Sequence, residues 1–116
     1  MNKCCNASDS QRKIYKIEVE AVYYVAPGIT HDVLYLYFNC KSCGAKGTVT
    51  AEIESAGKKF RYGKYPEKCL LLIKDCKNVN CSVKDAKEVF NDMDGDYDLI
   101  TNNCKTFSRE MFDELE

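Results

Sequence analysis

The order of its predicted elements makes this chain an α+β domain, an antiparallel five-stranded sheet followed by two helices. Through residues 13–73, apolar and polar side chains alternate or form short apolar runs, as they do in strands. From residue 81 onward, apolar side chains recur at the three- and four-residue spacing of amphipathic helices. Domains with strands first and helices last usually pack the helices onto the sheet.

Five segments carry the strand pattern, and turn-forming residues separate them. The first alternates clearly and stops at the Pro-Gly pair of residues 27–28. The second is so apolar that we expect both of its faces to be buried, and the fifth is a similar apolar run that we also expect to be buried. The five predicted strands are residues 13–26, 31–38, 48–54, 60–63 and 68–73.

Two amphipathic helices follow the strands. The first lies within residues 81–93, with Ser82 as its N-cap and Asp85 three residues later, which is close to a capping box. Its apolar face consists of Val83, Ala86, Val89, Phe90 and Met93. The second helix is capped by Asn103 or Thr101. Its apolar stripe consists of Cys104, Phe107, Met111 and Leu115.

Length and composition limit the possible classes of protein. A chain of 116 residues is enough for one core, so we expect a flexible N-terminal tail over residues 1–12 and a single domain over residues 13–116. The net charge of −1 and the mixed signs predict no nucleic-acid surface. No apolar run is long enough to span a membrane, and the polar start lacks the pattern of a secretory signal. We therefore expect an intracellular, cytoplasmic protein.

The segment YDLITNNCKTFSREMF, residues 97–112, places Cys104 in the first turn of the last helix. The helix dipole and the unpaired amides at such a position favour a thiolate. A nucleophilic thiol also needs a base, and His31, the one histidine of the chain, stands at the start of the second predicted strand. The alternatives are a buried, unreactive Cys104 and a His31 that is an ordinary core or strand-end residue.

The pattern Y-D-L-x-x-N-N-C-x-x-F at the start of the last helix, preceded by a histidine on a strand, resembles the permuted branch of the papain-like thiol enzymes. That branch includes the lecithin–retinol acyltransferase-like and PPPDE-type peptidase families. The resemblance implies that Cys104 is the nucleophile and His31 its base. It also implies a third polar residue on the next strand, which would orient the imidazole. We favour Glu52 for this position, with Glu54 and Thr50 as alternatives and a plain solvated strand face as the competing interpretation.

The resemblance covers residues 28–115, and three features depart from the pattern of those enzymes. Val33 stands two residues after the histidine, where a small residue is usual. Thr106 stands two residues after the cysteine, where many relatives carry histidine. An additional Cys-x-x-Cys lies between the second and third predicted strands. An inactive relative of these enzymes is therefore a further alternative.

Eight cysteines are many for a chain of this length. Cys40 and Cys43 have the spacing of a zinc knuckle, and Cys76 and Cys81 would complete a tetrahedral zinc site. We favour isolated thiols, and therefore no metal or other cofactor, over this zinc site and over disulfides such as Cys40–Cys43 or Cys76–Cys81. The Cys-Cys pair at residues 4–5 falls in the predicted tail.

These residues lead to a hypothesis about function. We expect a cysteine-dependent hydrolase that cleaves an amide, isopeptide or thioester bond through an acyl-enzyme intermediate. Its substrate would be a peptide, a protein or another acyl compound. The alternatives are a lipid acyltransferase of the same superfamily, a non-catalytic binding module with a structural cysteine–zinc loop, and a secreted domain held together by disulfides.

Overall fold

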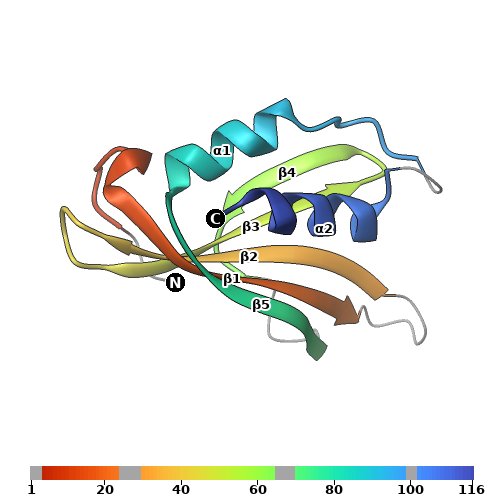
Figure 1. The fold of residues 1–116 in the computed structure, drawn as a ribbon, viewed down its shortest axis with the longest axis horizontal. Helices are drawn as coiled ribbons and strands as arrows, with labels where there is room; N and C mark the ends of the chain where they lie inside the picture. The colour runs from red at the N-terminus through yellow and green to blue at the C-terminus, as the bar shows by residue number, and fades with distance from the viewer. Residues whose placement is uncertain (1–3, 24–29, 65–69, 99–101) are drawn as a thin grey trace.

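The computed structural model describes residues 4–23, 30–64, 70–98 and 102–116, and it shows the predicted α+β class. Five antiparallel strands form one sheet in the order β4-β3-β2-β1-β5, and two helices follow along the chain (Figure 1). The elements are η1 (Asp9–Gln11), β1 (Arg12–Tyr23), β2 (Thr30–Cys40), β3 (Lys46–Glu54), β4 (Gly57–Tyr62), β5 (Leu70–Ser82), α1 (Val83–Asp92) and α2 (Cys104–Glu114). The permuted papain-like topology stays a prediction.

Strand β2 is the middle strand of the sheet, and both of its faces are buried, as its apolar sequence predicted. Leu34, Leu36 and Phe38 belong to the main core, whereas Val33 and Tyr35 form a separate buried cluster. Strand β1 pairs with one edge of β2, and β3 pairs with the other. Titratable side chains on β2 are therefore largely removed from water, which makes their charge depend on the neighbours that they contact.

Both helices cover the same face of the sheet (Figure 1). Phe107 and Met111 of α2 are fully buried in the main core, which α2 forms with β2 and β3. Phe90 of α1 meets Phe107 edge-on, with ring centroids 5.9 Å apart. This packing fixes α2 on the sheet, and its N-terminus lies over the end of the sheet where β2 begins (Figure 1).

Helix α1 begins as the sequence predicted. The hydroxyl of Ser82 accepts the backbone amide of Asp85 at 3.1 Å, and the carboxylate of Asp85 accepts the amide of Ser82 at 3.0 Å. The two bonds complete a capping box. The predicted apolar face is also confirmed: Val83, Ala86 and Phe90 are buried, and Val89 and Met93 are partly buried against the core.

Two predictions about the fifth strand are wrong. Strand β5 is thirteen residues long, so the segment from Cys76 to Cys81, which lies beyond the predicted end of the fifth strand at residue 73, belongs to a strand that pairs with β1. The apolar run is not buried throughout, since Leu72 and Ile73 are 53% and 57% exposed. The physical reason is position, because β5 is the edge strand beyond the part of the sheet that α2 covers.

The described part of the predicted N-terminal tail is attached to the sheet. Arg12, the first residue of β1, forms an ion pair with Asp9 at 2.7 Å. The same guanidinium donates a hydrogen bond to the carbonyl of Cys5 at 2.8 Å. The sequence predicts a flexible tail over residues 1–12, whereas residues 4–11 include these anchored groups.

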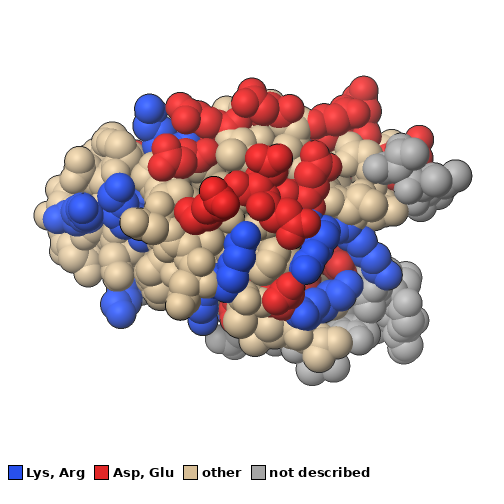
Figure 2. Space-filling model, viewed as in Figure 1, with Lys and Arg blue, Asp and Glu red and all other residues tan. Residues whose placement is uncertain are grey.

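Charge is unevenly distributed over the surface, although the net charge is only −1. Residues 83–116 contain ten acidic and four basic side chains. Figure 2 shows the acidic side chains gathered over the two helices, with several Lys and Arg side chains below them. Within the described residues, neither helix is long and apolar enough to cross a membrane.

Candidate active site

The last helix begins at Cys104, and a complete capping box fixes its N-terminus. Asn103 is the N-cap, and its side-chain oxygen accepts the amides of Lys105 and Thr106, each at 3.0 Å. The hydroxyl of Thr106 in turn accepts the amide of Asn103 at 2.9 Å. Thr106 departs from the papain-like pattern, and the capping box gives it a structural role in this chain. Thr101, the other predicted cap, lies outside the described residues.

Contacts along α2 turn Cys104 toward the start of β2. Ser108 is fully buried one turn further along the helix, and its hydroxyl donates a hydrogen bond to the carbonyl of Asp32 at 3.2 Å. Residues four apart on a helix lie on the same face, so Cys104 faces the same strand end as Ser108. His31 immediately precedes Asp32 on β2. The start of α2 and the predicted base are therefore neighbours.

His31 is buried near the start of β2 and has a carboxylate partner. Its Nε2 lies 2.7 Å from Oε1 of Glu52 on β3, and the Glu52 side chain is fully buried. The second carboxylate oxygen of Glu52 forms an ion pair at 2.7 Å with Arg61 on β4. Three neighbouring strands thus position one imidazole through successive charged side chains. A buried carboxylate needs such partners, because an unpaired charge in the interior is costly.

The thiol of Cys104 and the imidazole of His31 interact, and each shifts the pKa of the other. Burial alone would lower the pKa of His31, but the bonds to Cys104 and Glu52 outweigh burial and raise the pKa of His31 to about 9. Burial alone would raise the pKa of Cys104, but the imidazole and the backbone amide of Asp32 outweigh burial and lower it. Shifts in these two directions favour a thiolate–imidazolium pair at neutral pH.

Cys81 on β5 shows what burial does to a thiol without an imidazole. Like Cys104, it is half-buried. Burial raises the pKa of Cys81, and the nearby charge of Asp85 raises it further. The pKa of Cys104 shifts in the opposite direction. The charge of Cys104 therefore follows from its polar partners and not from its exposure.

Two neighbours of this site are missing from the sequence prediction. Arg61 forms an ion pair with Glu52. It can be identified as a neighbour of the site only from the pairing of β4 with β3, which sets Arg61 opposite Thr50. The backbone amide of Asp32 lowers the pKa of the Cys104 thiol, and Oδ2 of Asp32 accepts a hydrogen bond from Lys74 at 2.8 Å. Oδ1 of Asp32 is buried and has no hydrogen-bond partner among the described residues. No sequence pattern marks either residue.

The two alternatives to Glu52 have other partners. Thr50 donates its hydroxyl to a backbone carbonyl at 2.5 Å. Glu54 forms an ion pair with Lys59 at 2.7 Å. Three side-chain atoms, one each from His31, Glu52 and Glu54, lie within 4.8 Å of one another. Such a spacing could hold a cation. Both carboxylates already pair with a basic side chain, so their charge is balanced without a metal ion.

The predicted zinc ligands do not come together. Four sulfurs lie within 4.8 Å of one another, and they belong to Cys4, Cys5, Cys40 and Cys43. Cys76 and Cys81 lie instead on β5. Residues five apart on an extended strand are separated by about 16 Å, so a single ion cannot bind both of them. The predicted ligand set is therefore wrong in its second pair.

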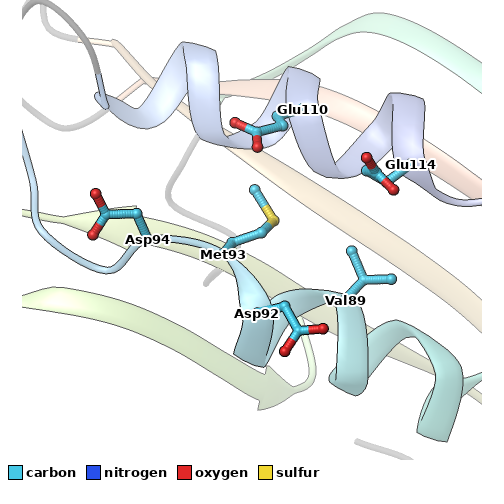
Figure 3. Close-up of a pocket in the computed structure, with 6 residues that line it drawn as sticks. All are labelled: Val89, Asp92, Met93, Asp94, Glu110 and Glu114. Carbon is cyan, nitrogen blue, oxygen red and sulfur yellow. The ribbon is translucent and has the colours of Figure 1, made fainter.

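An open hollow of about 240 Å³ lies between the two helices (Figure 3). Its lining is acidic apart from two apolar side chains and consists of Val89, Asp92, Met93, Asp94, Glu110 and Glu114. Neither His31 nor Cys104 lines it. A cluster of acidic side chains does not by itself identify a ligand, and we assign this hollow no function.

Comparison with known proteins returns no match. No family model, no curated protein and no solved structure matches this chain. Membership of the papain-like superfamily therefore stays a prediction from the sequence pattern, and a function has to be argued from His31, Glu52 and Cys104 themselves.

Proposed function

We propose that this protein is a cysteine-dependent hydrolase that cleaves an amide, isopeptide or thioester bond through an acyl-enzyme intermediate. One observation carries the proposal: a buried imidazole, the only one in the chain, bonds a buried carboxylate and shares its electrostatic environment with a thiol at a helix N-terminus. A nucleophile, its base and a group that orients the base are the parts that nucleophilic catalysis requires.

The proposed reaction uses these groups in two steps. The thiolate of Cys104 attacks the substrate carbonyl carbon, and the imidazolium of His31 gives its proton to the leaving amine or thiol as the carbon–nitrogen or carbon–sulfur bond breaks. The product is a thioester on Cys104 and a neutral imidazole. The imidazole then takes a proton from water, which attacks the thioester carbonyl. The acid leaves, and the proton taken from water restores the thiolate–imidazolium pair.

The backbone supports the oxyanion that forms in each step. The side chain of Asn103 occupies the amides of Lys105 and Thr106, the second and third of the helix. The amide of Cys104 is the first of the helix and belongs to the residue whose sulfur attacks. We assign this amide to the developing oxyanion, because helix N-termini favour negative charge and preorganised amide donors stabilise it.

Glu52 positions His31 and stabilises its charged form. The carboxylate lies at Nε2, which leaves the other ring nitrogen for the thiol. Arg61 occupies the far oxygen of the carboxylate and keeps Glu52 from turning away from the ring. Glu52 and Arg61 are thus positioning residues in this proposal, and Cys104 and His31 are the catalytic pair. An intracellular location, where thiols stay reduced, fits a reaction of this kind.

The experiment that tests the proposal uses an activated ester, because the natural substrate is not needed to detect an acyl-enzyme. We expect p-nitrophenyl acetate to release nitrophenolate in a burst equal to the protein concentration, with the acetyl group on Cys104 by peptide mass spectrometry. The Cys104→Ala and His31→Asn variants should lose the burst, and the matched Cys76→Ala variant, which lacks an exposed thiol, should keep it. Acetyl groups spread over several cysteines, with an unchanged burst in His31→Asn, would refute the proposal.

A lipid acyltransferase of the same superfamily would form the same acyl-enzyme, and the second step separates the two. For a hydrolase, the acetyl group leaves Cys104 in buffer alone. For an acyltransferase, it leaves rapidly only when an acceptor such as a lipid amine is added. Following the acetylated protein by mass with and without the acceptor distinguishes these outcomes.

A further inference from the structure

A group of four cysteine sulfurs lies at the end of the sheet opposite to His31. The sulfurs of Cys4 and Cys43 are 3.6 Å apart, and those of Cys5 and Cys40 are 3.9 Å apart. All four lie within 4.8 Å of one another. We propose that Cys4, Cys5, Cys40 and Cys43 bind one structural zinc ion.

The spacing of the sulfurs is that of a tetrahedral thiolate site. A zinc–sulfur bond of about 2.3 Å and tetrahedral angles place the sulfurs about 3.8 Å apart. The two distances of 3.6 and 3.9 Å lie on either side of that value. A disulfide would need a sulfur–sulfur distance of about 2.05 Å. Four thiolates with no other donor suit Zn²⁺, which takes tetrahedral sulfur ligands in closed structural sites.

The turn between β2 and β3 presents its two sulfurs as a zinc knuckle does. Gly44 has a φ of 76° and donates its amide to the carbonyl of Cys40 at 2.8 Å, which closes the turn.

The N-terminal segment supplies the other two sulfurs from outside the sheet. Adjacent side chains of a strand point in opposite directions, but Cys4 and Cys5 precede η1 and β1, and both sulfurs face the same cluster. The backbone amide of Lys41 donates to the carbonyl of Gln11 at 2.8 Å and joins the same two segments. A zinc ion would therefore fasten the N-terminus to the β2–β3 turn.

The charge of the site has a local counterion. Zinc binding displaces four protons from the thiols, and the complex of four thiolates with Zn²⁺ carries a net charge of −2. The guanidinium of Arg12 lies beside it, with Nε 3.3 Å from the sulfur of Cys4. Arg12 also binds Asp9 and the Cys5 carbonyl, so its position is fixed before any metal arrives.

The site is structural and not catalytic. Its four protein ligands leave no open position for a substrate or a water molecule. It is also remote from the thiol site, because His31 and Cys40 are nine residues apart on β2, a separation of about 30 Å along an extended strand. The proposal for this site does not rest on the proposed hydrolase activity.

Metal analysis of the full chain, purified in reducing buffer without chelator, tests the proposal. We expect one zinc per chain, and we expect removal of zinc by a strong chelator to lower the melting temperature. Cobalt substitution should produce the intense visible bands and sulfur-to-metal charge transfer of a tetrahedral thiolate site. The Cys40→Ser and Cys43→Ser variants should lose zinc, whereas the matched Cys76→Ser and Cys81→Ser variants should keep it.

Three results would overturn the proposal. A chain with no bound metal and eight reactive thiols after denaturation would show that the cysteines are isolated. A chain with no metal and four thiols missing would show disulfides in place of the zinc site. Zinc that is lost equally from the Cys40→Ser and Cys76→Ser variants would place the ion elsewhere. Because the wild-type metal content is measured directly, a variant that fails to fold does not affect the test.

Discussion

His31 bonds the carboxylate of Glu52, and His31 and the thiol of Cys104 shift each other's pKa, so the protonation state of one depends on that of the other. The pKa of His31 is raised to about 9, chiefly because its bonds to Cys104 and Glu52 outweigh the effect of burial. The imidazolium form is therefore present at neutral pH and is lost as the pH rises through about 9. The lowered pKa of Cys104 sets the lower limit of the range in which the ion pair exists.

The Glu52→Gln variant tests this description, because it removes a negative charge that stabilises the imidazolium. We expect the pKa of His31 to fall by about one unit or more, as it does when an opposite charge in direct contact is lost. The chain has a single histidine, so its ring signals in an NMR titration need no assignment.

The control is Glu88→Gln, which changes a largely exposed carboxylate on α1 and should leave the titration of His31 unchanged. A wild-type His31 that titrates near its ordinary value of about 6.5, or a titration that Glu52→Gln does not shift, would contradict the account.

Among the strands, the burial of apolar side chains differs sharply between the centre of the sheet and its edge. Leu34 on β2 is fully buried, whereas Leu72 on β5 is 53% exposed. Apolar sequence alone predicts burial for both, and only the order of the strands separates them. The position of β5 at the edge of the sheet is set by long-range pairing with β1, which local periodicity does not encode.

A pair of matched substitutions measures this difference. Leu34→Ala should lower the free energy of unfolding by about 2–5 kcal/mol, because it leaves a cavity in the core. Leu72→Ala should change it by no more than about 0.5 kcal/mol, as is usual for exposed positions. Urea denaturation of the two variants gives both values. Equal losses in the free energy of unfolding would show that the apolar side chains of β5 contact a partner in solution.

The elements that the sequence predicts best are those fixed by local contacts. The capping boxes of α1 and α2 involve residues three apart in sequence, and both N-caps, Ser82 and Asn103, were among the predicted residues. The burial of β2 follows from its own composition. The length of β5 did not follow, since residues 76–81 are polar enough to resemble a loop and become a strand only by pairing with β1.

At the scale of the whole molecule, β2 connects two chemically different ends. Strand β2 begins beside the N-terminus of α2 (Figure 1), and His31 is its second residue. Cys40 is its last residue, and its sulfur lies with those of Cys4 and Cys5 from the N-terminal segment. The residues of the first end were predictable, because a thiol at a helix start and a lone histidine are visible in the sequence. At the other end, the spacing of Cys40 and Cys43 predicted two of the four clustered cysteines. Cys4 and Cys5 could not be predicted, because no spacing rule describes their contact with Cys40 and Cys43.

If His31 makes Cys104 a thiolate, the rate of alkylation of Cys104 must depend on pH in a way that His31 controls. Iodoacetamide reacts with the thiolate, so the rate at Cys104, read from its own peptide, reports its ionisation. Cys81 serves as the internal control, since it is also half-buried but its pKa is raised.

We expect alkylation of Cys104 to reach its plateau below the pH at which Cys81 begins to react. In the His31→Asn variant, the Cys104 profile should move up toward the ordinary cysteine value of about 8.5, and the rate at neutral pH should fall about tenfold for each unit by which the new pKa exceeds that pH. A Cys104 that follows the profile of Cys81 in the wild type, with no change in His31→Asn, would contradict the claim.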